Sequence, residues 1–351
     1  MILSKINYKI ILLSALSTLF FACNETDPVP ELQVPDSYNS ANFATNTTAE
    51  AEVLDQLDML ADELNAMEAS NISSELTYPA TLESITLATY AAKIEVWLEE
   101  AEKAAGNEFD LENAPSGEGG LLGTRLLDEN GLELEQMVEK GSFGAALYNH
   151  ALDVLSEPAT EASIDQLVSI FGAEPSFSPD DTRFAATYAK RRSDNNAGEG
   201  FLYNVENSLI TAKAAIAAGP EYNFQFQNAI ATFLINWEAS NFATVIFYAN
   251  ATKDLIRNAG NDPVALGNAM HAYSEAVGFT EGWKGIQSKR ISDEQIDQIL
   301  ALLLAEDGQT PESYRFLNEP ALLDNMDQII DIIQNVYGFS EEDVAGFYVN
   351  N

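Results

Sequence analysis

The sequence predicts an all-α fold. Helix start and stop signals recur along the whole chain, and the sustained alternation of apolar and polar residues that marks strands is absent. Apolar residues make up 46% of the 351 positions, enough to exclude a disordered chain. A chain of this length has room for one large helical body or two lobes.

The expected helices follow from these signals in order. The first covers 47–67, the second about 81–104, and a long helix about 222–258. The expected helix starts are the capping boxes Thr47-x-x-Glu50, Ser163-x-x-Gln166 and Ser292-x-x-Gln295, together with first-turn prolines at Asp262-Pro263 and Glu319-Pro320. The expected stops are Gly219-Pro220, Gly260, Gly308 and Gly338.

Two glycine-rich stretches, 106–131 and 172–200, are expected to be long loops. The first lacks the Gly-Lys-Ser/Thr ending of a phosphate-binding loop. The second contains Asp194-Asn195-Asn196 but lacks the ligand order and distal glutamate of a calcium-binding EF-hand. Neither stretch therefore predicts a phosphate or calcium site.

A weak internal repeat relates the segments that begin at Glu139 and Glu238. In each, glutamate is followed at equal spacing by small residues, an aromatic residue (Phe143 or Phe242), an aliphatic residue and a second aromatic. A true duplication predicts two packed helical bundles, with lobes at about 45–158 and 159–351. A chance similarity between helical sequences is the alternative.

The N-terminus has the pattern of a bacterial lipoprotein signal. Lys5 and Lys9 precede a short apolar stretch that ends at Ala22, directly before Cys23. The segment Leu19-Phe20-Phe21-Ala22-Cys23 resembles a lipobox, in which the cysteine carries the lipid. We therefore expect a signal peptide at 1–22, then a lipidated Cys23 with a flexible tether over 23–44, whose prolines favour extended chain. The alternative is a chance cysteine in a signal peptide that is cut elsewhere.

The net charge of the chain indicates which classes of partner it can bind. The chain has 17 basic and 55 acidic residues, for a net charge of −38. Such a field repels nucleic acid and anionic lipid headgroups, so we expect no nucleic-acid partner. An acidic surface that concentrates cations or a basic partner is one interpretation, and a solvated surface that resists aggregation is the other.

Several catalytic and metal-binding arrangements are excluded by composition. There are two histidines and one cysteine, so a site with several histidines and a cysteine nucleophile outside the anchor are both excluded. The Gly-x-Ser-x-Gly and His-Glu-x-x-His signatures are also absent.

His271 and Glu275 form the candidate site. They lie four residues apart in the helix that begins at Asp262-Pro263, so their side chains share one face, with Gly267 and Gly278 on the same stripe. Glycine inside a helix costs about 1 kcal/mol relative to alanine, so we expect another backbone or a ligand to approach closely there. The opposite stripe, which includes Met270 and Tyr273, is the expected core face.

Glu238 is the third candidate residue. It interrupts the long helix at 222–258, which is apolar nearly all round and is expected to be central and buried. A buried carboxylate needs a partner, which His271, a metal or a bound cation would supply. The alternative is a purely structural hydrogen-bond network of histidine and glutamate between two helices. His150 is expected at the surface without a partner.

Five short motifs occur along the chain in a fixed order. They are Pro35-Asp-Ser-Tyr38-Asn39, Leu57-Asp58-Met59-Leu60, Glu139-Lys-Gly141-Ser-Phe-Gly144, Trp237-Glu238 and His271-x-x-Ser274-Glu275-Ala-x-Gly278-Phe279. Together they resemble an uncharacterised lipoprotein family of Gram-negative bacteria that is allied to the imelysin-like (insulin-cleaving membrane protease) group. The resemblance implies an all-helical fold of two bundle-like parts and a cell-envelope location, with a role in iron or other metal uptake or a peptidase activity. The group's Gly-x-His-x-x-Glu signature is spaced differently here, so only His271 and Glu275 are carried over.

Three functions are therefore expected in order of preference. The first is a non-enzymatic binding protein at the outer membrane, anchored by its lipid and serving metal or iron acquisition, with His271, Glu275 and Glu238 as metal ligands and an envelope protein as a further partner. The second is an imelysin-type peptidase. The third is a structural surface protein.

Overall fold

Helices hold 64% of the described residues and strands 3%, which confirms the all-α class. The structure is a computed structural model that describes residues 29–351. The expected signal peptide at 1–22, Cys23 and the first part of the tether lie outside the described residues.

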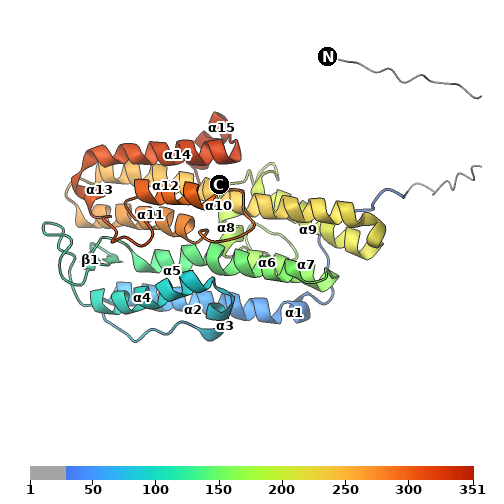
Figure 1. The fold of residues 1–351 in the computed structure, drawn as a ribbon, viewed down its shortest axis with the longest axis horizontal. Helices are drawn as coiled ribbons and strands as arrows, with labels where there is room; N and C mark the ends of the chain where they lie inside the picture. Colours follow the sequence, from blue (N-terminus) through green and yellow to red (C-terminus); the bar gives the residue numbers. More distant parts are fainter. Residues whose placement is uncertain (1–28) are drawn as a thin grey trace, which may run out of the picture. The chain divides into compact units, whose positions relative to one another are not determined.

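The elements follow one another as a chain of helices interrupted by one small hairpin (Figure 1). The α-helices are α1 (Phe43–Asn46), α2 (Thr48–Ser70), α3 (Ala80–Ile85), α4 (Ala88–Ala104), α5 (Leu134–Ser142), α6 (Asn149–Ser156), α7 (Glu161–Phe171), α8 (Phe184–Arg191), α9 (Phe201–Ala218), α10 (Asn223–Ala259), α11 (Pro263–Glu281), α12 (Asp293–Leu302), α13 (Arg315–Asn318), α14 (Asp324–Tyr337) and α15 (Glu341–Phe347). The other elements are strands β1 (Gly120–Leu122) and β2 (Arg125–Leu127), the π-helix η1 (Phe143–Tyr148) and the 3₁₀-helices η2 (Pro220–Tyr222) and η3 (Pro320–Leu323). β1 and β2 pair antiparallel, with Leu121 opposite Leu126.

Helix α10 is the central element, as its sequence predicts. Phe233, Trp237 and Phe242 are each at most 1% exposed, and the helix packs against α8, α9, α11 and α14. The segment Pro220–Ala259 is long and apolar enough to cross a membrane by length and composition. Because 67% of its apolar window is buried inside the fold, we interpret it as a core helix.

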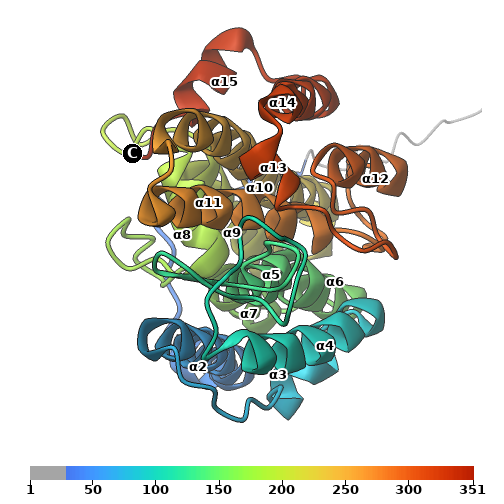
Figure 2. The same ribbon diagram turned by 90° about the vertical axis from the view of Figure 1, so that its left-hand side faces the viewer.

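The helices from α2 onward lie in layers on either side of α10 and α11 (Figures 1 and 2). Helices α2, α3 and α4 form one outer layer, and α5, α6 and α7 lie between it and α10–α11. Helices α14 and α15 cover the opposite side of α10. This order places α11 directly against α5, with α4 and α2 behind α5.

The expected lobes at 45–158 and 159–351 are not separate bodies. Residues Leu32–Asn351 form one compact unit, in which α7 contacts α2 and α11 contacts α5 across the expected boundary. The repeat also differs in local structure, because Phe143 begins a π-helix whereas Phe242 lies within the regular α-helix α10. The structure gives the proposed duplication no support.

The later part of the expected tether is packed. Tyr38 is 6% exposed and donates a hydrogen bond to Asp165 of α7. The same carboxylate accepts from Ser40 at 2.6 Å, from Asn46 at 2.7 Å and from Lys213 at 2.7 Å. A buried carboxylate with four donors holds this segment against α7 and α9, so the expectation of unpacked chain through residue 44 is wrong.

Local signals place most helix ends but miss some elements. The Ser292 capping box and the Asp262-Pro263 start are confirmed, whereas α7 begins at the Thr160 cap three residues before Ser163. The expected helix over 81–104 is broken into α3 and α4. Tertiary packing adds the β1–β2 hairpin to the first expected loop and α8 to the second.

Candidate functional site

The two glycines that flank His271 mark close backbone approaches, as expected. A Cβ atom on Gly278 would lie 2.6 Å from the carbonyl oxygen of Gln136 in α5. A Cβ atom on Gly267 would lie 2.2 Å from the carbonyl oxygen of Leu122 in β1. These contacts press α11 against α5 and the hairpin, and they bring the polar stripe of α11 onto the side chains of α5.

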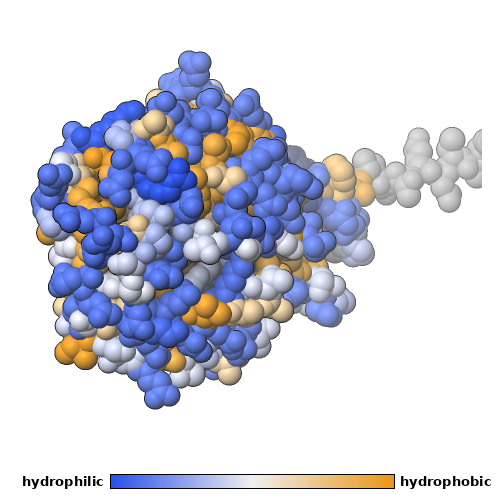
Figure 3. Space-filling view, turned by 60° about the vertical axis from the view of Figure 1, so that its left-hand side comes forward, coloured by the Kyte–Doolittle hydropathy of each residue, from blue (hydrophilic) through white to orange (hydrophobic). Residues whose placement is uncertain are grey.

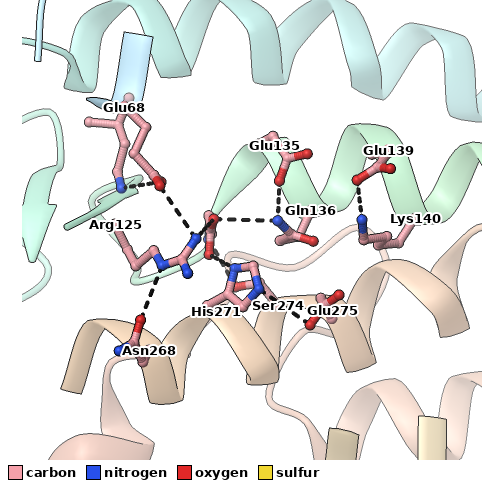
Figure 4. A network of polar contacts seen from close by, with 12 residues as sticks. Glu68, Arg125, Glu135, Gln136, Glu139, Lys140, Asn268, His271, Ser274 and Glu275 are labelled. Atoms are coloured by element: carbon pink, nitrogen blue, oxygen red, sulfur yellow. Dashed lines mark hydrogen bonds and ion pairs between the residues drawn. The ribbon is translucent and has the colours of Figure 1, made fainter. Parts of the chain in front are cut away.

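Both ring nitrogens of His271 face carboxylates (Figure 4). Nδ1 lies 2.8 Å from Oε2 of Glu133, and Nε2 lies 3.4 Å from Oε2 of Glu275. The side chain of His271 is 25% exposed, whereas those of Glu133 and Glu275 are almost fully buried. His271 therefore lies at the mouth of a buried acidic cluster.

Helix α5 supplies the other half of the cluster (Figure 4). Glu135 and Glu139 are one turn apart and share a hydrogen bond, and Lys140 donates to Glu139. Gln136 donates to Glu135 and, at 3.4 Å, to Glu133. Its own Oε1 is buried and has no hydrogen-bond partner among the described residues.

Arg125 connects the cluster to α2 and the hairpin. Its Nη1 lies 3.4 Å from Glu68 of α2 and 3.5 Å from Glu133, and its Nε donates to Asn268 of α11 at 3.3 Å. With a side chain that is 25% exposed, Arg125 borders the mouth beside His271. The Glu133 amide donates to Ser274 at 2.9 Å, which fixes the start of α5 against α11.

The cluster contains five carboxyl groups (Glu68, Glu133, Glu135, Glu139 and Glu275) and three basic groups (Arg125, Lys140 and His271). Burial raises the pKa of Glu135 well above its usual value, and the charges of Glu139 and Glu133 add to this shift. Burial also raises the pKa of Glu275, and it raises that of Glu68 to about 7. These shifts move the carboxyl groups toward their protonated forms, as expected where buried carboxyl groups outnumber basic groups.

The carboxylates around His271 favour its charged form. Burial alone would lower the pKa of His271, but the hydrogen bond to Glu133 and the charges of Glu133 and Glu275 outweigh burial and raise it. The protonated imidazole that this shift favours has no lone pair for a metal or for a substrate proton. As arranged, both ring nitrogens of His271 lie next to carboxylates of the protein itself.

The third predicted metal ligand, Glu238, lies elsewhere in the fold. Its Oε1 accepts hydrogen bonds from the amides of Arg290 and Ile291 at 2.8 and 2.9 Å and from the hydroxyl of Tyr337 at 2.7 Å. Buried at 2% exposure, it ties α10 to α14 and to the segment before α12. The expected pairing of Glu238 with His271 is wrong, because backbone amides and a tyrosine satisfy the carboxylate.

Two further findings bear on the sequence-based expectations. Across residues 29–351, no group of three or more His, Cys, Asp or Glu side chains is arranged to hold a metal ion. His150 does have a neighbour, because its Nε2 lies 3.4 Å from Oε1 of the buried Glu50 in α2. It joins α6 to α2 and is not an unpartnered surface residue.

Sequence reasoning found His271 and Glu275 but missed most of their partners. Glu133 is 138 residues from His271 along the chain, and only the packing of α5 on α11 brings them together. The available signal was the run Glu133-Leu-Glu135-Gln-Met-Val-Glu139-Lys140, in which charged residues alternate with apolar residues that belong to the core. Such density of charge beside core residues indicates a buried polar network.

Comparison of the chain with known protein families, with curated proteins and with solved structures gives no match.

Proposed function

We propose that this chain is an envelope-anchored, non-enzymatic binding protein whose ligand is positively charged. The observation that supports it is the carboxylate surplus around His271, where five carboxyl groups lie with three basic groups among α2, the hairpin, α5 and α11. A cation that enters beside His271 would supply positive charge to buried carboxyl groups that outnumber their basic partners. The lipoprotein-like N-terminus and the imelysin-like motifs support the envelope location and are part of the proposal.

The engagement of His271 favours binding over catalysis. A peptidase would need a free base or a water-activating metal, and His271 offers neither as arranged. If the bound cation is inorganic, the proposed function is metal or iron acquisition. It requires His271 or Arg125 to move away from the carboxylates that they now pair with.

The test is cation-dependent melting of the complete chain, purified in detergent, with Fe³⁺, Zn²⁺ and Ca²⁺ added separately. A cation at 100 times its Kd is expected to add about 2.7 kcal/mol of stability. His271→Ala opens the cluster and should change this gain. His150→Ala removes the other histidine and Glu238→Gln alters the other candidate carboxylate, and both should leave the gain unchanged.

Two results would reject the proposal. One is a chain whose melting responds to no cation, inorganic or organic. The other is hydrolysis of an unfolded protein substrate by the wild type that is abolished in Glu275→Gln, which would favour the peptidase.

A further inference from the structure

A second acidic site lies on the other side of α5 and α11 from α10, in a cavity of about 440 Å³. Its walls are α4, the turn between β2 and α5, the end of α11 and the loop Ala305–Pro311. This volume lies within the range of small-molecule sites, about 300–1,000 Å³. The cavity does not share its lining with the His271 cluster.

The lining is strongly acidic. Among the described residues that line the cavity, Lys93 is the one basic residue. Six carboxylates line it, namely Glu100, Asp128, Glu129, Glu281, Glu306 and Asp307. Lys93 bridges Glu281 and Asp307 at 2.5 Å each, and Lys284 also pairs with Asp307 at 2.9 Å. These lysines neutralise two of the six carboxylates and fix the loop over the cavity.

The remaining carboxylates have no basic partner within ion-pair distance in the described part of the chain. The carboxylate of Asp128 accepts hydrogen bonds from the backbone N–H groups of Asn130 and Leu132 and from the side-chain amide of Asn130. None of these donors is charged. Burial raises the pKa of Asp128 to about 6 and also raises the pKa of Glu100. The charge of Lys103, which lines an adjoining hollow with these residues, offsets the shift of Glu100 only in part.

Two further side chains mark the cavity as more than an acidic cluster. Asn130 lines it and is 8% exposed, and its buried Oδ1 has no hydrogen-bond partner among the described residues. Trp97 also lines it, with its ring held edge-on by Tyr90 at a centroid distance of 5.4 Å. No cation of the described residues lies over that ring. Carboxylates, an amide oxygen and an indole are together the groups that bind ammonium and guanidinium ions.

We propose that this cavity binds an organic cation, an ammonium or guanidinium group held by Glu100, Asp128 and Glu129 with Trp97 against its face. The inference rests on the proposed function in one respect, that the chain binds cations, and it adds a second site that takes an organic cation. Within the protein, the ammonium group of Lys93 is already bound in this way, between the carboxylates of Glu281 and Asp307. A free polyamine and a basic peptide side chain both supply the required group.

Titration calorimetry on the complete chain tests the assignment with two probes, spermidine and a blocked Gly-Arg-Gly peptide. Binding of either is expected and identifies the source of the cation. The double variant Glu100→Gln/Glu129→Gln should weaken binding by about tenfold or more, because it removes two charge-assisted contacts. The matched control, Asp62→Asn/Glu63→Gln, removes the same charge from exposed positions of α2 outside the cavity and should leave the affinity within about twofold.

Tryptophan emission provides a second readout. Of the three tryptophans, Trp237 and Trp283 are at most 1% exposed, so a ligand in the cavity should change the emission of Trp97. The emission change should disappear in Trp97→Phe while calorimetry still detects binding. An emission change that persists in Trp97→Phe would place the ligand elsewhere.

The outcomes separate this inference from the proposed function. The cavity assignment is overturned if neither probe binds, if the control variant weakens binding as much as the cavity variant, or if Ca²⁺ binds as tightly as the probes with the same variant sensitivity. If a cation binds and only His271→Ala alters its affinity, the proposed function stands and the cavity assignment fails. If no cation of any kind binds, both fail.

Discussion

The interpretation of His271 depends on which side chains surround it. Its spacing from Glu275 is that of many metal-binding pairs, but Glu133 occupies the opposite ring nitrogen at 2.8 Å. Two carboxylates around one imidazole favour the protonated ring. A residue that the sequence offers as a ligand thus lies between two carboxylates of the protein itself.

The pH dependence of stability should report this role. The pKa of His271 is raised on folding above the unfolded value of about 6.5, so the folded state binds its proton more tightly. The stabilisation is fully present below the unfolded pKa and is lost as pH rises through the folded pKa. The difference in unfolding free energy between the wild type and His271→Gln should therefore be largest below pH 6.5 and shrink above it, as measured by urea denaturation across pH.

His150→Gln is the control for loss of a histidine, because it contacts one carboxylate at 3.4 Å in another part of the fold. A difference between the wild type and His271→Gln that grows as pH rises would show that folding lowers the pKa of His271 and favours the neutral ring. That result would restore His271 as a candidate metal ligand.

At the scale of elements, small residues decide how closely α11 lies on α5 and η1. Gly278 meets the Gln136 carbonyl, and Gly282 meets the Gly141 carbonyl, where an added Cβ would lie 2.0 Å away. This approach allows the charged side chains of α5 and α11 to reach one another. The cluster therefore depends on positions that carry no side chain.

Gly278→Ala should separate the two helices. Its Cβ would lie 2.6 Å from a backbone oxygen that cannot rotate away, so the helices must move apart, at a cost of about 1–3 kcal/mol. The matched control is Gly346→Ala in α15, where the added Cβ meets nothing within 4 Å and a small gain is expected. Urea denaturation of both variants measures the difference, and equal stability would contradict the close packing of α11 on α5.

The π-helix η1 is a second feature of this layer. It follows α5 without a break and leads directly into α6, and all six of its residues are buried. The wider turn of a π-helix changes the direction in which its side chains point. In η1 this change allows Tyr148 to pack against Trp237 and Trp283. Because the corresponding segment of α10 is regular, the similar sequences at 139 and 238 have different structural roles.

At the scale of the whole molecule, the net charge of −38 dominates long-range electrostatics. The face shown in Figure 3 is mostly hydrophilic, with apolar side chains in small separate groups. Such a surface keeps the folded chain soluble but repels itself, which lowers the stability of the compact state. The same field attracts cations toward both acidic clusters.

Salt should therefore stabilise the chain. The screening length falls from about 10 Å at 0.1 M to about 3 Å at 1 M salt, so added NaCl weakens repulsion between distant carboxylates more than attraction within close pairs. We expect the melting temperature to rise with NaCl, as measured by calorimetry, with sucrose of equal osmolality as the control. A melting temperature that falls with salt would show that the ion pairs outweigh the net repulsion.

The sequence by itself determined the features that depend on neighbouring residues. Helical periodicity and caps gave the all-α class, the central α10 and the start of α11 at Asp262-Pro263, because these signals act within one or two turns. The glycines at 267 and 278 also predicted close backbone approach, since their cost in a helix needs a packing reason.

Only the tertiary structure decided which charges meet. Glu238 pairs with amides of a distant segment, His271 pairs with the carboxylate of the residue just before α5, and Asp128 lines a cavity together with residues 305–311. Each pairing joins residues that are far apart along the chain. A buried carboxylate requires a partner, but periodicity does not identify that partner, because the choice depends on how whole helices pack.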